Sequence, residues 1–275
     1  MAELDRLSDA HARDRGIPGS IGEPGPTAYH RLNPLTKATA ATITAVAAVA
    51  LGGLIGPLLL VVLAIAVPAT AAQVLGRLVR TAMLLALPIA VSIFVVNVFF
   101  FPGGETVLLR IGPITATAEG LAFAIEILVR ILAISGAVTL FYLTTRPADL
   151  TVDLERRGIS PRIAFVANAS VQTVPAMVDR AAMITDAQRA RGLDTEASIW
   201  RRVRGIIPIV APVILGSIAE VEERTMALEA RGFTRPGRRT LLWAPADSTR
   251  QSVVRWLLVA ALLALIVARV AGWVG

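Results

Sequence analysis

The 275-residue chain contains no cysteine and only two histidines, His11 and His30. A disulfide framework and a thiolate metal site are therefore excluded. Both histidines precede the first long apolar run, so we expect no buried zinc or iron centre. Charged residues are also scarce, because 17% of the chain is charged while 55% is hydrophobic, with a mean hydropathy of +0.67. Soluble domains keep roughly a quarter of their residues charged, so this composition indicates an integral membrane protein.

Lysine is nearly absent, since Lys37 is the only one among 27 basic residues. The loop that binds nucleotide phosphates needs a glycine-rich turn followed by Lys-Ser or Lys-Thr. Lys37 instead follows Asn33-Pro34-Leu35-Thr36, so the chain has no such ATP-binding loop. The sequence also lacks the HExxH and GxSxG motifs. We therefore expect no catalytic residue, no cofactor and no enzymatic activity in this chain.

The other basic residues are arginines, and they are unevenly distributed. The net charge of +7 and the pI near 11.1 would suggest nucleic-acid binding in a soluble protein. Here the arginines lie between and after apolar runs, most densely in residues 146–255, so we expect contact with a lipid bilayer and no nucleic acid. Cytoplasmic segments carry the excess of basic residues. We predict a multi-pass protein of the cell membrane, with its N-terminus and residues 146–255 in the cytoplasm and its C-terminus outside.

Five apolar runs predict an all-α integral membrane protein with about five transmembrane helices plus a cytoplasmic helical module. The predicted spans lie near residues 38–54, 57–75, 83–101, 120–145 and 256–274. The uncharged stretch 38–76 is nearly twice as long as one bilayer crossing requires, and the glycines and proline of 52–57 supply a turn. Arg77 and Arg80 are expected in a short cytoplasmic loop, and residues 103–119 in an external, hairpin-like loop.

These patterns divide the chain into four segments. They are a disordered cytoplasmic tail (1–30), a membrane domain with four spans (31–145), a cytoplasmic module of amphipathic helices (146–255) and a last transmembrane helix (256–275). The tail is rich in glycine and proline and lacks the apolar core of a signal peptide. Helices are expected in the module near 147–157, 161–178, 179–191 and 212–231. The uncharged stretch 205–219, which contains two prolines, is expected to pack against the membrane face or other spans.

Glu126 and Arg130 are ionisable residues inside the fourth predicted span. They lie four residues apart, on one face of a helix. Ionisable groups within a membrane often form a proton or ion site. An internally paired salt bridge that lets the helix pack is the interpretation that we favour.

A tripeptide occurs twice in the arginine-rich module: Ala190-Arg191-Gly192 recurs as Ala230-Arg231-Gly232. Glycine just after a helix and arginine in its last turn are typical of ordinary helix C-termini. A rigid helix end also presents a guanidinium group suited to bidentate contact with a carboxylate of a partner protein. Two such ends suit a partner that is itself a pair.

With this topology, the repeated tripeptide resembles a signature of the T component of energy-coupling factor (ECF) transporters, the family that includes the cobalt-transport permease CbiQ. That family carries two Ala-Arg-Gly-type signatures at the ends of cytoplasmic coupling helices. The segment Leu32-Asn33-Pro34-Leu35-Thr36-Lys37 resembles its Leu-Asp-Pro-Arg-Thr-Lys, with Asn for Asp and Leu for Arg. The segment Thr144-Thr145-Arg146-Pro147-Ala148-Asp149-Leu150 resembles its Thr-Thr-x-Pro-x-Asp-Leu.

The resemblance implies the transmembrane coupling subunit of an ECF-type ABC importer for a vitamin or a metal ion. Two ATP-binding cassette subunits would hold the helix ends at Arg191 and Arg231, and a separate substrate-binding membrane S component would capture the substrate. The residues implied in ATPase coupling are Ala190, Arg191, Gly192, Ala230, Arg231 and Gly232. Closure of the ATPase pair on ATP would draw the two helix ends together.

Two other functions stay open from the sequence. The permease of an ordinary ABC importer would carry a coupling loop with a glycine four residues after Glu-Ala-Ala and an Ile-x-Leu-Pro ending. After Glu229-Ala230 the glycine comes earlier, at Gly232, and no such ending follows. A membrane scaffold without a transport role would have no ATPase partner.

Overall fold

The computed structural model describes residues 27–102, 106–111, 114–192, 199–233, 235 and 245–272. Most of the predicted tail, residues 1–26, lies outside this described part. The described residues form two compact units. One contains the residues up to Leu154 together with those from Pro245 onward, and the other contains those from Glu155 to Arg235.

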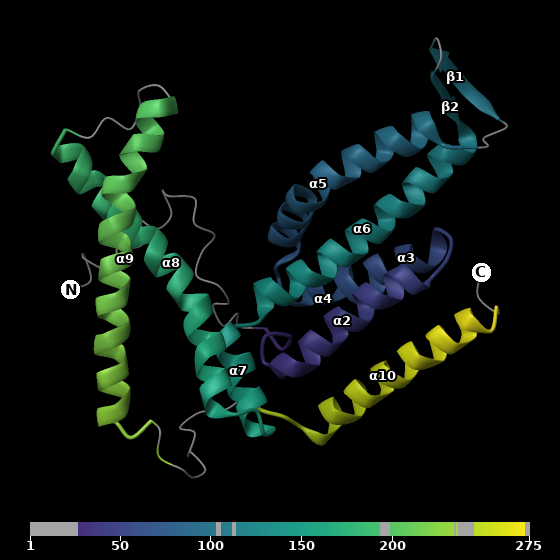
Figure 1. The fold of residues 1–275 in the computed structure, drawn as a ribbon. Coiled ribbons are helices and arrows are strands. Elements are labelled where there is room, and N and C mark those ends of the chain that lie inside the picture. The colour runs from purple at the N-terminus through teal and green to yellow at the C-terminus, as the bar shows by residue number, and fades with distance from the viewer. Residues whose placement is uncertain are drawn as a thin grey trace. The chain divides into compact units, whose positions relative to one another are not determined.

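The first unit contains the apolar helices and a small hairpin (Figure 1). Its elements are α2 (Pro34–Ala50), α3 (Ile55–Leu59), η1 (Leu60–Ala66), α4 (Val67–Ala71), α5 (Leu75–Phe100), β1 (Val107–Ile111), β2 (Ile114–Thr117), α6 (Ala118–Thr144), most of α7 (Pro147–Arg156) and α10 (Thr249–Val270). The helices α5, α6 and α10 are each long and apolar enough to cross a membrane. Two shorter apolar segments accompany them, namely α2 and the continuous run α3–η1–α4. The predicted all-α membrane fold is confirmed.

Local sequence signals set where these helices begin. Asn33 caps α2 with its side chain, which accepts a hydrogen bond from the Leu35 amide, and Pro34 occupies the first helical position. Thr117 caps α6 and Ser248 caps α10 in the same way. Polar caps of this kind bond amide groups that have no partner within the helix.

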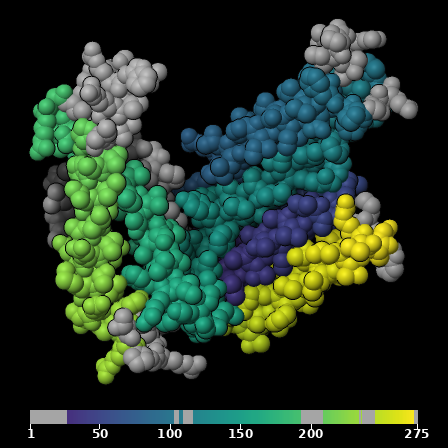
Figure 2. All heavy atoms as spheres, in the orientation of Figure 1, coloured from purple at the N-terminus to yellow at the C-terminus, as the bar shows by residue number. Residues whose placement is uncertain are grey.

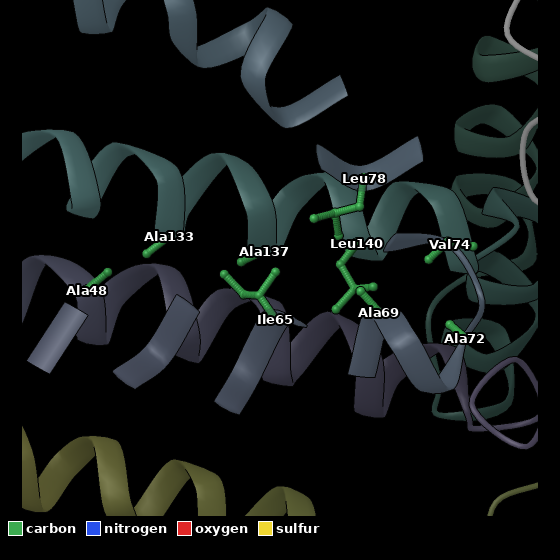
Figure 3. Close-up of a cluster of buried hydrophobic side chains, with 9 residues drawn as sticks. All are labelled: Ala48, Ile65, Ala69, Ala72, Val74, Leu78, Ala133, Ala137 and Leu140. Carbon is green, nitrogen blue, oxygen red and sulfur yellow. The ribbon is translucent and has the colours of Figure 1, made fainter. Parts of the chain in front are cut away.

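The core of this unit is built from small residues, which let the helices approach closely (Figure 3). Ala133 and Ala137 of α6 lie with Ala48 of α2 and Ile65 of η1 in one buried cluster. Helix α6 runs antiparallel to both α2 and α5, because Arg130 bonds to Leu51 while Lys37 bonds to Thr144, and Ser135 bonds to Ala82. Helices α2 and α10 lie side by side, as the space-filling view in Figure 2 shows.

The loop between the second and third apolar segments is shorter than the sequence predicted. We expected Arg77 and Arg80 in this loop, but α5 already begins at Leu75, so both arginines lie in its first two turns. The connection consists of residues 72–74, where Gln73 has a positive φ of 57°. Both side chains are exposed. Long arginine side chains reach out of an apolar helix, so the charges do not end it.

The hairpin-like loop predicted for 103–119 is confirmed in its described residues. Strands β1 and β2 pair antiparallel, with Val107 opposite Thr117 and Ile111 opposite Ile114. The hairpin leads directly into α6, and the Thr106 amide and hydroxyl donate to Glu119 in the first turn of that helix.

The second unit consists of two long helices, α8 (Pro161–Ala190) and α9 (Ile199–Ala230). The sequence predicted separate helices at 161–178 and 179–191, which is wrong, because α8 runs unbroken through Pro175. The helix predicted at 212–231 begins thirteen residues earlier, at Ile199, and contains the ambiguous stretch 205–219 in its interior. A proline costs one backbone hydrogen bond, and both helices continue through their internal prolines. Whether 205–219 packs against the membrane face stays a prediction.

Candidate functional site

The first Ala-Arg-Gly tripeptide forms the C-terminus of α8. Ala190 is the last helical residue, and Gly192 adopts the left-handed conformation, with φ +92°. The Gly192 amide donates to the Arg189 carbonyl at 2.9 Å and the Arg191 amide to the Gln188 carbonyl at 3.1 Å. A side chain at Gly192 would meet no neighbour within 4 Å, so glycine is favoured here by backbone conformation and not by space.

The second tripeptide ends α9 with the same geometry. Ala230 is the last helical residue and Gly232 has a φ of +69°. The Phe233 amide then donates back to the Leu228 carbonyl at 2.9 Å, which is the bonding pattern of a glycine-terminated helix. The capping role that the sequence suggested for both glycines is therefore present. Arg191 and Arg231 are both exposed, and neither guanidinium has a hydrogen-bond or ion-pair partner among the described residues.

The contacts between α8 and α9 show that the two helices pack antiparallel. The rings of Phe165 and Phe233 meet edge to face, with centroids 5.0 Å apart. Near the other end, the Gln188 side chain donates to the Pro208 carbonyl at 3.3 Å. The two signature ends therefore lie at opposite ends of the pair. They are separated by most of the length of α8, about 35–40 Å at 1.5 Å per residue.

Arg180 and Glu220 form an ion pair near the middle of this helix pair. Arg180 also lies 3.4 Å from the Ser217 hydroxyl, and it passes over Gly216, where an added Cβ would lie 3.8 Å from its side chain. Glu220 accepts a second bond from Arg224 at 2.8 Å. The hydrogen bond and charge of Arg180 lower the pKa of the Glu220 carboxyl. Sequence reasoning missed this pair, because partners 40 residues apart cannot be assigned without the helix register.

A second group of polar residues lies in the first unit, and we call it the polar cluster; six of its members are buried, Gln251 is half-buried and Asp247 is exposed. Its members are Asn33, Thr36, Lys37, Thr144, Asp153, Asp247, Gln251 and Arg255. They come from the start of α2, the end of α6, α7 and the start of α10. The cluster brings together the two segments whose sequences resembled family motifs, 32–37 and 144–150.

Lys37 joins α2 to α6 within the polar cluster. Its ammonium group donates to the carbonyls of Thr144, at 2.7 Å, and His30, at 3.0 Å, and lies 5.6 Å from the centroid of the Tyr29 ring. The Thr144 carbonyl belongs to the last turn of α6, where carbonyl groups lack helical partners and favour a cation. The nearby Asp149 carboxyl has its pKa raised by burial, against the opposing charges of Arg146 and Lys37.

Asn33 and Asp153 form the most deeply buried pair of the polar cluster. Asn33 is 0% and Asp153 2% exposed, and the Asn33 side-chain amide donates to the Asp153 carboxylate at 3.1 Å. The Asn33 backbone amide donates to the Gln251 side chain at 2.8 Å. Asn33 therefore bonds to α7 and to α10 while it caps α2.

Arg255 holds the start of α10 on α2. Its guanidinium binds both carboxylate oxygens of Asp247 at 3.0 Å and donates to the Thr36 hydroxyl at 2.9 Å. Such bidentate contact fixes the geometry as well as the charge. Sequence reasoning placed Arg255 just outside the last span without assigning it a role. Within the described ranges, no group of three or more His, Asp or Glu residues is placed to hold a metal ion.

Comparison with known proteins finds a family and several relatives. The family model described as cobalt transport protein, CbiQ, matches residues 25–241. A protein of Bacillus selenitireducens named energy-coupling factor transporter transmembrane protein EcfT is 30% identical over 243 residues, which is 82% of this chain and 88% of that protein. Proteins of the same name are 32% identical in Listeria innocua, over 56% of this chain and 63% of that protein, and 32% identical in Brevibacillus brevis, over 65% and 68%.

The match therefore spans less than two thirds of the Listeria protein and most of the Bacillus protein. The matched region of this chain includes the polar-cluster segments 32–37 and 144–153 and both Ala-Arg-Gly tripeptides. The chain belongs to the CbiQ family and is a transmembrane T component of the energy-coupling factor transporter type.

Proposed function

We propose that this chain is the coupling subunit of an ATP-driven importer in the cell membrane. The two helix ends at Arg191 and Arg231 contact two ATP-binding cassette subunits in the cytoplasm. A separate substrate-binding membrane subunit captures a vitamin or a metal ion. The N-terminus and the α8–α9 unit are cytoplasmic, and the β1–β2 hairpin and the C-terminus lie outside.

The observation that carries this proposal is the pairing of two equivalent helix ends at opposite ends of one antiparallel helix pair. Each end has an exposed arginine fixed beside a left-handed glycine. A dimer of ATPases presents the same docking surface twice, at two separated places. Two equivalent donors about 35–40 Å apart suit such a partner, whereas a single partner site would need only one.

The arginines suit carboxylates on the ATPases for a chemical reason. A guanidinium group donates two parallel hydrogen bonds to one carboxylate, which gives direction as well as charge. Truncating one partner of such a buried charge pair typically costs about 2–5 kcal/mol, part of which is the cost of the charge left unpaired. This corresponds to roughly 30- to several-thousand-fold in affinity.

The packing of α8 on α9 supports a transmission role. Near the two helix ends, α8 and α9 meet through the ring contact of Phe165 with Phe233 and the bond from Gln188 to the Pro208 carbonyl, and the Arg180–Glu220 ion pair lies between them. Helices that share such contacts slide by about 1–2 Å when an interface rearranges. ATP-driven approach of the two helix ends would shift the pair and thereby the membrane subunits attached to it.

The test uses the tagged chain purified from its native membrane together with the ATP-binding subunits that copurify with it. Arg191→Ala and Arg231→Ala are each expected to lower the affinity of the chain for the ATPase subunits at least about 30-fold, so that less ATPase copurifies. The double variant is expected to abolish copurification. Arg189→Ala and Arg224→Ala are matched controls, since both remove an exposed arginine from the same helices. They should have small effects, because exposed ion pairs contribute little.

The result that would overturn the proposal is specific. If the double variant retains the ATPase subunits and their ATP hydrolysis at the level of the unmodified chain, the tripeptides serve only as helix caps. If no ATPase copurifies with the unmodified chain, a scaffold function replaces the coupling function.

A further inference from the structure

Asn33 connects three helices through three different atoms. Its side-chain oxygen accepts from the Leu35 amide and caps α2, its side-chain amide donates to Asp153 of α7, and its backbone amide donates to Gln251 of α10. The coupling function proposed above uses neither Asn33 nor Asp153. Both lie in the polar cluster, far along the chain from the two Ala-Arg-Gly tripeptides.

A buried polar pair of this kind often adds little net stability to the fold. Well-packed apolar residues often stabilise a protein as much as a buried ionic or polar pair, and the polar pair then serves to fix one arrangement of the elements. A hydrogen bond to a charged group stabilises an arrangement only while both partners stay in place. The Asn33–Asp153 bond therefore resists separation of α7 from the start of α2.

The position of α7 in the chain makes this bond relevant to movement. Helix α7 begins three residues after the end of α6 and is followed by α8 after the short connection 157–160. That connection contains Gly158, which has a φ of +104°. Through the chain itself, a displacement of α8 reaches the first unit at α7. Asp153 lies in the last turn of α7, the end that leads into this connection.

On the Asn33 side of the Asn33–Asp153 bond, the N-terminal ends of the apolar helices α2 and α10 lie next to each other. Thr36 bonds to Arg255 and Asn33 bonds to Gln251, so α2 and α10 run parallel from the polar cluster. Force applied to Asn33 acts on the N-terminal end of both helices. Lys37, by contrast, hydrogen-bonds to the backbone at the end of α6.

We propose that the Asn33–Asp153 hydrogen bond is the positioning link that transmits movement of α8 and α9 to the membrane helices α2 and α10. This inference rests on the proposed function, because it takes an ATP-driven movement of α8 as its source. Asn33 and Asp153 are positioning residues and contact neither nucleotide nor substrate.

The chemistry of the pair allows an exchange that separates linkage from folding. Asn33→Asp keeps the cap of α2, since a carboxylate also accepts from the Leu35 amide, but it sets two buried carboxylates against each other. Adding Asp153→Asn restores the bond with donor and acceptor exchanged and with the net charge unchanged. Asn33→Ser is a second test variant, because serine caps a helix well and is too short to reach Asp153.

Asn97→Ser is the matched control for Asn33→Ser. Asn97 also donates its side-chain amide in a membrane helix, but to the Ile93 carbonyl of its own helix α5. Its loss removes an asparagine bond of similar kind without disconnecting two helices.

The absence of cysteine allows one reporter to be placed at a time. Val46→Cys on α2 and Leu257→Cys on α10 are exposed positions for a bimane fluorophore, and the cysteine-free complex labelled in parallel gives the background. The complex with its copurified ATPases is trapped with ATP and vanadate, and the change in emission is measured beside ATP hydrolysis and the melting temperature. No transported substrate is needed.

In the unmodified chain and in Asn97→Ser, trapping should change the emission at both reporters. Asn33→Ser and Asn33→Asp should reduce that change at least about fivefold while the ATPases stay bound and hydrolyse ATP. The exchanged pair, Asn33→Asp with Asp153→Asn, should restore the change in emission to within about twofold of that in the unmodified chain.

Three results would overturn the link. They are an absence of any response to trapping in the unmodified complex that hydrolyses ATP, a normal response in Asn33→Ser, and a failure of the exchanged pair to restore the response in a folded complex. Failure of the coupling function itself looks different, because the ATPases would then not copurify at all.

Discussion

The guanidinium of Arg130 in α6 donates a hydrogen bond to the Leu51 carbonyl, 3.3 Å away, at the residue that follows the end of α2. The same guanidinium pairs with Glu126 one turn earlier in α6. The internal pairing favoured from the sequence is thus observed, and it has a second purpose that the sequence did not indicate. Arg130 binds a carbonyl at the turn between α2 and α3, just past the end of α2 where carbonyl groups lack helical partners.

Replacing Arg130 tests this dual role. Arg130→Ala should lower the free energy of unfolding by about 1–3 kcal/mol, because it leaves the Glu126 carboxylate and the Leu51 carbonyl without their donor. The exchange of Glu126→Arg with Arg130→Glu should recover only part of this loss, since glutamate cannot donate to Leu51. Thermal unfolding in detergent measures both. Normal stability of Arg130→Ala combined with lost transport would instead support the ion site.

Gly120 tests the close approach of α5 and α6. A Cβ at this position would lie 2.4 Å from the Asn97 carbonyl oxygen and 2.9 Å from the Phe101 Cβ. Gly120→Ala should therefore force the two helices apart and destabilise the fold by about 1–3 kcal/mol. Gly76→Ala in α5 is the control, because an added Cβ there meets nothing within 4 Å. It should be neutral or slightly stabilising, as alanine favours a helix. Equal melting temperatures for the two variants would contradict this packing.

The Arg180–Glu220 ion pair should make the α8–α9 packing depend on pH. Arg180 lowers the folded-state pKa of Glu220, so the pair contributes above the ordinary glutamate pKa of about 4.3. This contribution is lost as the pH falls through the lowered value. Hydrogen exchange of α8 and α9 amides should be faster in Arg180→Ala at neutral pH and differ less from the unmodified chain near pH 3. Arg224→Ala is the control, because Arg224 bonds Glu220 within α9 itself. An unchanged exchange rate in Arg180→Ala would show that the pair does not hold the helices together.

Membrane orientation can be tested with single cysteines in this cysteine-free chain. Thr106→Cys, beside the hairpin, and Gly272→Cys, after α10, should react with an impermeant thiol reagent in intact cells. Ser160→Cys and Glu223→Cys, on the α8–α9 side, should react only after the cells are opened. The arginine distribution is the physical basis of this expectation. Labelling of Glu223→Cys in intact cells would reverse the proposed orientation.

Local features of the sequence determined which segments become helices and where several of them end. The five apolar runs, the hairpin and the glycines at 192 and 232 were predicted because each depends on residues within a few positions of one another. Glycine sets the end of α8 and α9 through its own backbone, whatever packs nearby. The break predicted between 178 and 179 and the helix start predicted at 212 were wrong, because both helices continue through these positions and through their internal prolines.

Only the tertiary structure decided which polar residues meet. Lys37 stood in the sequence as an isolated lysine, and its partner carbonyl at Thr144 lies 107 residues away. Asn33 with Asp153 and Arg180 with Glu220 are separated by 120 and 40 residues. A side chain has several possible partners in an unfolded chain, and helix packing selects one by bringing two faces together and excluding water. The sequence supplied the donors and acceptors, but the register between helices assigned them to each other.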